Sequence, residues 1–502
     1  MAHQLIAAVD LGSNSFRLQI GRVVGNQIYP LDSLKEPVRL AAGLLPNKTL
    51  DGASQLRGIE ALSRFGERLR GFAATDVRAV ATNTLRVAKN ARQFLLQAEA
   101  ALGFPIEVIA GREEARLIYL GVAHTLPNPK SRQLVVDIGG GSTECVIGSD
   151  FRPQHLESLY MGCVSYSLRF FPGGKVEKHR FKEAELAACA ELETISLPYR
   201  ESGWDEAVGS SGTAKAITDL IELNGFNAGG ATGITREGLD RLRGALLKAG
   251  SASALKLEGL RPDRIPVLPG GVAIMSAVFR EFGLEQMTFS EGALRLGVLY
   301  DLLGRYHHDD LREATVNLFM QRYGVDRRQA ARVGFTAAKL LTQLDPDCRD
   351  PEHPDGRFLA WAARLHEIGI SMAHASYHKH SSYILANADM PGFSRRDQIR
   401  LSHLVLAHRG KLERMEGEVI DPRGWLLIFC LRLAALLHRS RRDVAIPGLE
   451  ARVKGNGYQL KFPQGWLDAS PLTAAALEDE KAHWSSLGMS LAVAWQSGQE
   501  GA

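Results

Sequence analysis

The strongest constraint on the fold is a short acidic motif that occurs twice in the chain. The first copy is Asp10-Leu-Gly-Ser-Asn-Ser15, and the second is Asp137-Ile-Gly-Gly-Gly-Ser-Thr143. Each copy follows an apolar run and precedes another β-rich run. Each therefore predicts two strands joined by a tight turn, with an aspartate at the end of the first strand. The repetition predicts two similar α/β lobes.

These turns have the composition of an anion site. Glycine and small hydroxyl residues let the backbone bend sharply and point its N–H groups at a bound anion. An aspartate beside them can hold a hydrated metal ion. A P-loop is excluded because no Gly-Lys-Ser/Thr follows the glycines, and the strand after each turn disfavours a Rossmann loop. An actin-like fold remains, in which duplicated ribonuclease-H-like lobes surround a cleft.

Length and composition are those of a soluble multidomain protein. The chain has 502 residues, 45% of them hydrophobic, and a formal net charge of +4, so its overall charge does not indicate nucleic acid as a partner. Its five cysteines lack metal-type spacing, which predicts a reduced, cytoplasmic protein. We expect no signal peptide and no transmembrane segment, because the apolar stretch 425–437 is short and contains Arg432. Peripheral association with a membrane stays open.

Changes of pattern along the chain predict four domains. Residues 1–125 and 126–303 alternate strand and helix signals and correspond to the two expected lobes. Residues 304–445 have helical periodicity, which predicts an all-α domain. Residues 446–502 combine a hairpin signal around Gly455-Asn-Gly457 with a following helical stretch, which predicts a small α+β domain.

Several further motifs accompany the two acidic turns. They are Thr84-Leu-Arg86, Gly111-Arg-Glu-Glu-Ala-Arg116, Met161-Gly-Cys163 and Gly209-Ser-Ser-Gly-Thr213 in the first 300 residues, and Leu365-His-Glu-Ile-Gly369 and His378-Lys-His-Ser-Ser-Tyr383 beyond them. Together with the acidic turns they resemble the exopolyphosphatase/guanosine pentaphosphate phosphatase (Ppx/GppA) family in its long form, and its exopolyphosphatase branch in particular. The resemblance implies the actin-like fold, an HD-like third domain and a homodimer.

The resemblance assigns the catalytic role to Glu114. A carboxylate at the cleft can take a proton from water that attacks the terminal phosphorus. Only one of Glu113 and Glu114 should face the cleft, because neighbours on a helix point about 100° apart. Asp137 and Glu144, with Asp10 opposite, are candidate ligands of Mg²⁺, which prefers hard oxygen donors.

The candidate phosphate-binding groups are one arginine and a set of small residues. Arg86 could clamp phosphate with its planar guanidinium. The others are short hydroxyl or amide side chains and glycines that expose backbone N–H groups: Ser13, Asn14, Ser15, Gly139, Gly140, Gly141, Ser142, Thr143, Ser211, Gly212 and Thr213. Taken singly, each is equally typical of an ordinary turn.

The helical region carries a different prediction. HD-type metal phosphohydrolases need a His-Asp pair that bridges metals, whereas this chain has His366-Glu367. We therefore expect this domain to be non-catalytic. Basic residues are frequent in it, and we hypothesise that some of them form a track that guides a polyanion toward the cleft.

We therefore expect a Mg²⁺-dependent exopolyphosphatase that releases terminal orthophosphate from inorganic polyphosphate, processively, by direct attack of water. The alternative is the same chemistry on guanosine pentaphosphate (pppGpp). Two other classes fit the fold: an ATP-dependent kinase or chaperone, in which Leu268-Pro-Gly-Gly271 would imitate a nucleotide-binding turn, and a non-catalytic polyphosphate sensor. The presence of Glu114 argues against the sensor.

Overall fold

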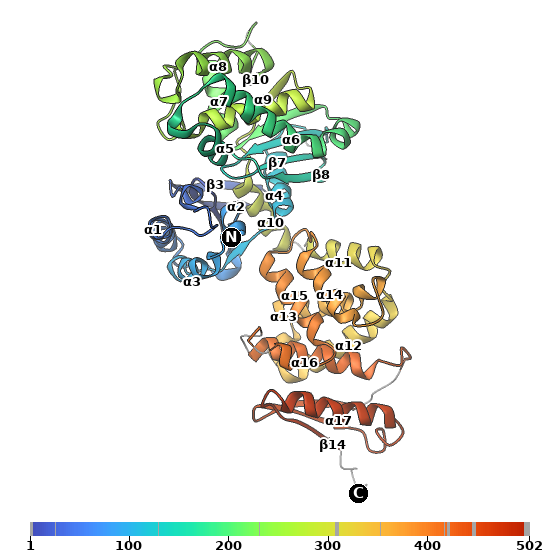
Figure 1. Ribbon diagram of the computed structural model, residues 1–502. Coiled ribbons are helices and arrows are strands. Elements are labelled where there is room, and N and C mark those ends of the chain that lie inside the picture. Colours follow the sequence, from blue (N-terminus) through green and yellow to red (C-terminus); the bar gives the residue numbers. More distant parts are fainter. Residues whose placement is uncertain are drawn as a thin grey trace. The chain divides into compact units, whose positions relative to one another are not determined.

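The chain forms two compact units, residues 1–310 and 311–502 (Figure 1). The computed structural model describes residues 4–25, 27–128, 130–229, 231–306, 311–351, 353–415, 417–418, 422–443 and 448–495. The expected boundary between residues 445 and 446, and most of the segment 306–310, lie outside the described residues.

The first unit contains two sheets with the same strand order. The sheet of the first lobe runs β3-β2-β1-β4-β5, and that of the second lobe runs β8-β7-β6-β9-β11 with β10 added beyond β11. In the first lobe, β1 pairs antiparallel with β2 and parallel with β4. In the second lobe, β6 pairs in the same way with β7 and β9. The strands are β1 Leu5–Leu11, β2 Phe16–Val24, β3 Gln27–Glu36, β4 Val77–Ala81, β5 Ile106–Val108, β6 Gln133–Ile138, β7 Thr143–Ser149, β8 Arg152–Leu159, β9 Glu206–Ser210, β10 Ile234–Thr235 and β11 Gln286–Phe289. The predicted duplication and actin-like fold are confirmed.

Helices cover the sheets because their apolar faces match the sheet surfaces. In α1, Asp51 caps the first turn by accepting from the Ser54 amide at 2.6 Å, and Ala61, Leu62 and Phe65 are buried on one face. The other helices of the first unit are α2 Asn83–Val87, α3 Ala91–Leu102, α4 Gly111–Ala123, α5 Cys163–Phe170, α6 Lys178–Ser202, α7 Ser211–Leu223, α8 Arg236–Ala249, α9 Leu268–Phe282 and α10 Leu294–Tyr306, with α1 at Gly52–Arg68.

The segment Leu268-Pro-Gly-Gly271, which would imitate a nucleotide-binding turn in a kinase, is buried. It forms the first turn of α9, with Pro269 at a position that needs no backbone N–H. Gly270 lets α9 approach α5 closely, because a β-carbon on it would lie 2.6 Å from the Cys163 carbonyl oxygen. By length and composition Ile265–Phe282 could cross a membrane, but 72% of it is buried, as in a core helix.

Helices α4 and α10 pack together between the lobes, in contact with strands β7 and β8 on one side and β1 and β4 on the other (Figure 1). Their backbones touch through glycines. A β-carbon on Gly297 would lie 1.7 Å from the Leu117 carbonyl oxygen, and one on Gly121 would lie 2.3 Å from that of Ala293. Helix α10 thus joins the first lobe's sheet, although its sequence follows the second lobe.

The second unit is mostly helical and ends in a small sheet. Its core is continuous, since Phe429 of α16 stacks on Tyr458 of β13 with ring centroids 3.9 Å apart. The predicted hairpin and following helix are present, and β14 adds parallel to β13. The elements are α11 Leu311–Arg322, α12 Arg327–Leu344, α13 Pro354–Leu365, α14 Tyr377–Asn387, α15 Arg395–Ala407, α16 Pro422–Leu437, β12 Glu450–Lys454, β13 Gly457–Phe462, α17 Pro471–Ser485 and β14 Leu491–Trp495.

Candidate active site

The two acidic turns, one from each lobe, line the same cavity of about 360 Å³. Residues 12–15 join β1 to β2, and residues 139–142 join β6 to β7. The turns lie against each other, because a β-carbon on Gly140 would lie 3.0 Å from the Ser13 Cβ atom. Within the described residues, the backbone N–H groups of Gly140 and Gly141 donate to no protein acceptor. The cavity therefore has the free donors that an anion needs.

A third turn, residues 211–213 at the start of α7 directly after β9, also lines the cavity. Ser211 adopts a positive φ of 68°, and the Thr213 hydroxyl donates to the Ile138 carbonyl at 2.8 Å. Arg264 lies directly over Gly212, since a β-carbon there would lie 2.0 Å from a guanidinium nitrogen. The N-terminus of α7 and this arginine together make the third turn attractive to phosphate.

The structure brings most of the predicted phosphate-binding residues to this cavity, with two exceptions. Those that line it are Ser13, Asn14, Ser15, Gly139, Gly140, Gly141, Ser142, Ser211, Gly212 and Thr213. Thr143 is instead fully buried, and its hydroxyl donates to the Met161 carbonyl at 2.6 Å. Arg86 lies behind the cavity wall, where it donates to Glu114 at 2.7 Å and to the Ile109 carbonyl at 3.0 Å. Arg86 is therefore placed to orient Glu114 rather than to clamp phosphate.

Glu114 and Glu113 point in different directions, as the helical spacing predicts. Glu114 lines the cavity from the first turn of α4. Glu113 instead accepts two hydrogen bonds from Arg116, at 2.7 and 2.8 Å, and Arg116 also bridges to Asp301 of α10 at 2.5 Å. This buried ion network fixes the rotation of α4, so that Glu114 is the glutamate presented to the cavity.

Six carboxylates line the cavity, and four of them, Asp10, Glu114, Asp137 and Glu144, are the predicted catalytic and metal-binding acids. Burial raises the pKa of Asp10 and of Asp137 to about 6 in each case. Burial also raises the pKa of Glu114, partly offset by Arg86, and it raises the pKa of Glu144 well above its ordinary value, reinforced by Glu114 and Asp137. The Oδ1 atom of Asp10 is buried and has no hydrogen-bond partner among the described residues. An all-oxygen set with an unsatisfied buried oxygen fits a hard divalent cation.

Several cations of the cavity were not predicted: Arg17, Lys35, Lys215, Arg261, Arg264 and Arg295. Burial, together with the charge of Arg295, lowers the pKa of Arg17 to about 10, and burial also lowers the pKa of Arg295. Arg17 could have been found, because it stands opposite Asp10 in the β1–β2 register. Arg264 and Arg295 follow no local pattern. Glu114 pairs with Arg86, but among the described residues the other three predicted acids form no ion pair within 4 Å, and neither do Arg17 and Arg295. A bound metal–phosphate pair would supply the missing charges to both groups.

In the second unit, the His366-Glu367 pair is engaged in structural contacts. His366 Nδ1 lies 2.7 Å from the Ala363 carbonyl oxygen, and Glu367 accepts from Arg441 at 2.6 Å. The guanidinium of Arg441 thus neutralises the residue that replaces the expected aspartate. The predicted polyanion track stays a prediction.

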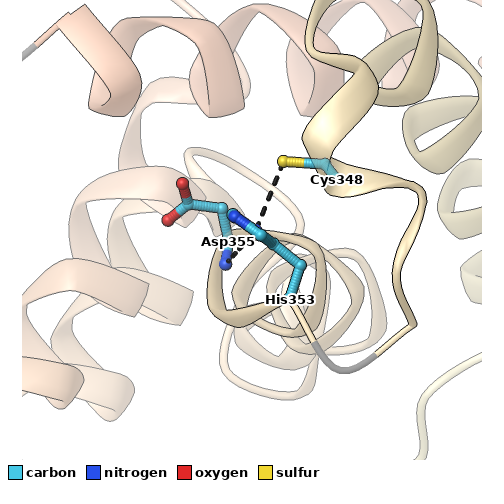
Figure 2. A group of neighbouring side chains, drawn as sticks. All are labelled: Cys348, His353 and Asp355. Carbon is cyan, nitrogen blue, oxygen red and sulfur yellow. Dashed lines mark hydrogen bonds between the residues drawn. The ribbon is translucent and has the colours of Figure 1, made fainter. Parts of the chain in front are cut away.

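Figure 2 shows a second group that resembles a metal site, Cys348, His353 and Asp355, whose candidate ligand atoms lie within 4.8 Å of one another. The His353 Nδ1 atom accepts from the Asp355 amide at 3.3 Å and so caps α13. The Asp355 carboxylate binds Arg400 and Arg423, and it points away from Cys348 in Figure 2. Burial raises the pKa of Cys348 to about 11, so its thiol is protonated at neutral pH. These contacts make the group a structural one.

Comparisons with known proteins identify the family of this chain. A model of the Ppx/GppA phosphatase family matches residues 19–306, and a model of domain III of that family matches residues 311–481. The chain is 39% identical over 488 residues to the guanosine-5'-triphosphate,3'-diphosphate pyrophosphatase of Aeromonas hydrophila, covering 96% of this chain and 97% of that protein.

Two solved structures are also similar. The PPX-GPPA enzyme of Aquifex aeolicus is 26% identical with a TM-score of 0.50, and the match covers 59% of this chain and 99% of that one. An exopolyphosphatase from Cytophaga hutchinsonii is 23% identical with a TM-score of 0.54, covering 60% of this chain and 98% of that one. The second likeness concerns the fold alone.

Proposed function

The chain belongs to the Ppx/GppA phosphatase family and is a phosphoanhydride hydrolase, and from this premise we propose that it hydrolyses the terminal 5'-phosphoanhydride of pppGpp. The observation that carries the choice of substrate is the 39% identity, along almost the whole chain, to a pyrophosphatase named for this nucleotide. Sequence reasoning ranked inorganic polyphosphate first and pppGpp second. The similarity to this relative instead supports pppGpp as the first choice of substrate and polyphosphate as the second.

In the proposed reaction, the oxygen of a water molecule attacks the terminal phosphorus, and Glu114 takes one of its protons. The bond to the bridging oxygen breaks, which leaves orthophosphate and guanosine bis(diphosphate). The N–H groups of residues 140–141 and the cations Arg264 and Arg295 stabilise the charge of the transferring phosphoryl group. No side chain needs to form a covalent intermediate.

Mg²⁺ belongs to the same proposal. Asp10, Asp137 and Glu144 would hold it, because they are the oxygen donors that line the cavity beside the phosphate-binding turns. When bound, the ion would neutralise phosphate charge and so favour attack by water. The homodimer and the cytoplasmic location stay predictions of the sequence.

The test is phosphate release from pppGpp, long-chain polyphosphate and ATP, measured side by side with Mg²⁺. We expect the highest kcat/KM on pppGpp. A preference for polyphosphate would support the exopolyphosphatase that we expected from the sequence. Transfer of phosphate from ATP to a small acceptor would indicate a kinase. The variant Glu114→Ala measures, for every substrate, the phosphate release that does not depend on Glu114.

A further inference from the structure

The cavity extends beyond the phosphate-binding turns, along α7 into the second lobe. There it is lined by residues of a different character. We call this end the distal pocket, and it consists of Lys215, Asp219, Gly259, Arg261, Phe289 and Glu291. Lys215 and Asp219 lie one turn apart on α7, so both can face the same space.

The acids of the distal pocket are poorly suited to a pure polyanion. Asp219 is partly exposed to the cavity, and among the described residues its carboxylate accepts no hydrogen bond. Glu291 differs, because its carboxylate pairs with Lys215 at 2.7 Å and its side chain is 77% exposed. An unpaired carboxylate beside a phosphate site repels phosphate, so its presence indicates a ligand part that donates hydrogen bonds.

Phe289 gives the distal pocket an aromatic wall. The Lys215 ammonium lies 5.1 Å from the centre of its ring, which covers part of the ring and leaves it partly exposed. Gly259 also lines the distal pocket and packs closely against α7. Its φ is +83°, and a β-carbon on it would lie 2.6 Å from Leu223 and 3.8 Å from the Asp219 Cβ atom. A partly exposed aromatic ring with a free carboxylate acceptor in the same pocket can hold a planar heterocycle that carries hydrogen-bond donors.

We propose that the distal pocket binds the guanine base and that Asp219 determines the base specificity. This inference rests on the proposed function. Guanine carries two adjacent donors, N1–H and the 2-amino group, which match the two oxygens of one carboxylate. Adenine presents an acceptor instead of N1–H, and that acceptor would face the carboxylate unpaired. Inosine keeps N1–H but lacks the 2-amino group.

The experiment measures the affinities of GTP, ITP and ATP by calorimetry with Mg²⁺, for the wild-type protein and for Asp219→Asn. The wild type should bind GTP about ten- to hundredfold more tightly than ITP, the effect of one hydrogen bond to a charged group. Asp219→Asn should bring the GTP/ITP ratio close to one. The ratio is the informative quantity, because removal of a negative charge strengthens the binding of every triphosphate alike.

Two further variants control the result. Asp240→Asn removes an exposed carboxylate of α8 in the same lobe and should leave the ratio unchanged. Glu291→Gln should also keep the ratio, since that carboxylate is already paired. Equal affinity of the wild type for GTP and ITP, or a ratio lost in Glu291→Gln and kept in Asp219→Asn, would overturn the assignment. Failure of the proposed function would show separately, as absent phosphate release from pppGpp.

Discussion

The proposed chemistry depends on Glu114 and on its contact with Arg86. The carboxylate lines the cavity and receives a hydrogen bond of 2.7 Å from Arg86, while the neighbouring Glu113 is bound to Arg116. The functional difference between two adjacent glutamates therefore comes from their contacts and not from their chemistry.

The first prediction concerns the proposed base. Glu114→Gln keeps the size of the side chain but cannot accept a proton, so kcat for phosphate release should fall about 10²- to 10⁴-fold. Affinity for pppGpp, measured by calorimetry, should change little. The control is Glu60→Gln on the exposed face of α1, and retained turnover in Glu114→Gln would remove Glu114 from this role.

A second prediction separates orientation of Glu114 from phosphate binding. Arg86 lowers the pKa of Glu114, so Arg86→Met should raise that pKa and move the acid limb of the kcat–pH profile to higher pH. Arg86→Lys should move it less, because the ammonium keeps the charge. If Arg86 instead clamps phosphate, KM will rise and the acid limb will stay in place.

The acids of the cavity predict how pH acts on the metal-free protein. The pKa values of Asp10 and Asp137 rise from 3.8 to about 6 on folding. Their contribution to stability is therefore fully present below pH 3.8 and is lost as pH rises through about 6. Mg²⁺ should raise the Tm more at pH 7.5 than at pH 5, where protons compete for the same oxygens. An equal rise in Tm at both pH values would contradict this placement of the metal.

At the scale of elements, the glycine contacts of α4 and α10 hold the lobes around the cavity. Gly297→Ala would force its methyl group into the Leu117 carbonyl oxygen, and we expect a loss of about 1–3 kcal/mol in the free energy of unfolding. Gly244→Ala in α8 is the control. A β-carbon there meets no atom within 4 Å, so the substitution should stabilise by about 0.5–1 kcal/mol. Urea denaturation measures both, and equal effects would refute the packing argument.

At the scale of the whole molecule, each unit has its own core. The clusters of the first unit contain residues up to 303 and that of the second unit starts at 316. The Aquifex aeolicus structure matches 59% of this chain over 99% of its own length, so a related chain of that size folds without the rest.

We therefore expect residues 1–306 alone to fold and to hydrolyse pppGpp and short polyphosphate. If the second unit carries a polyanion track, the truncated protein should show a raised KM for long-chain polyphosphate only. Thermal unfolding of the truncated protein serves as the control for folding. An equal loss on short and long chains would refute the track.

The sequence by itself determined the duplicated hairpins, the helix that carries Glu114 and most of the phosphate-binding turns. These features depend on turn chemistry and hydrophobic periodicity, which act over a few residues. Only the tertiary structure decided that Thr143 faces the core, that Arg86 contacts Glu114, and that Arg264 and Arg295 reach the cavity. Which side of a strand or loop is buried, and which distant charges meet, depends on contacts between residues far apart in the sequence, which form only when the chain folds.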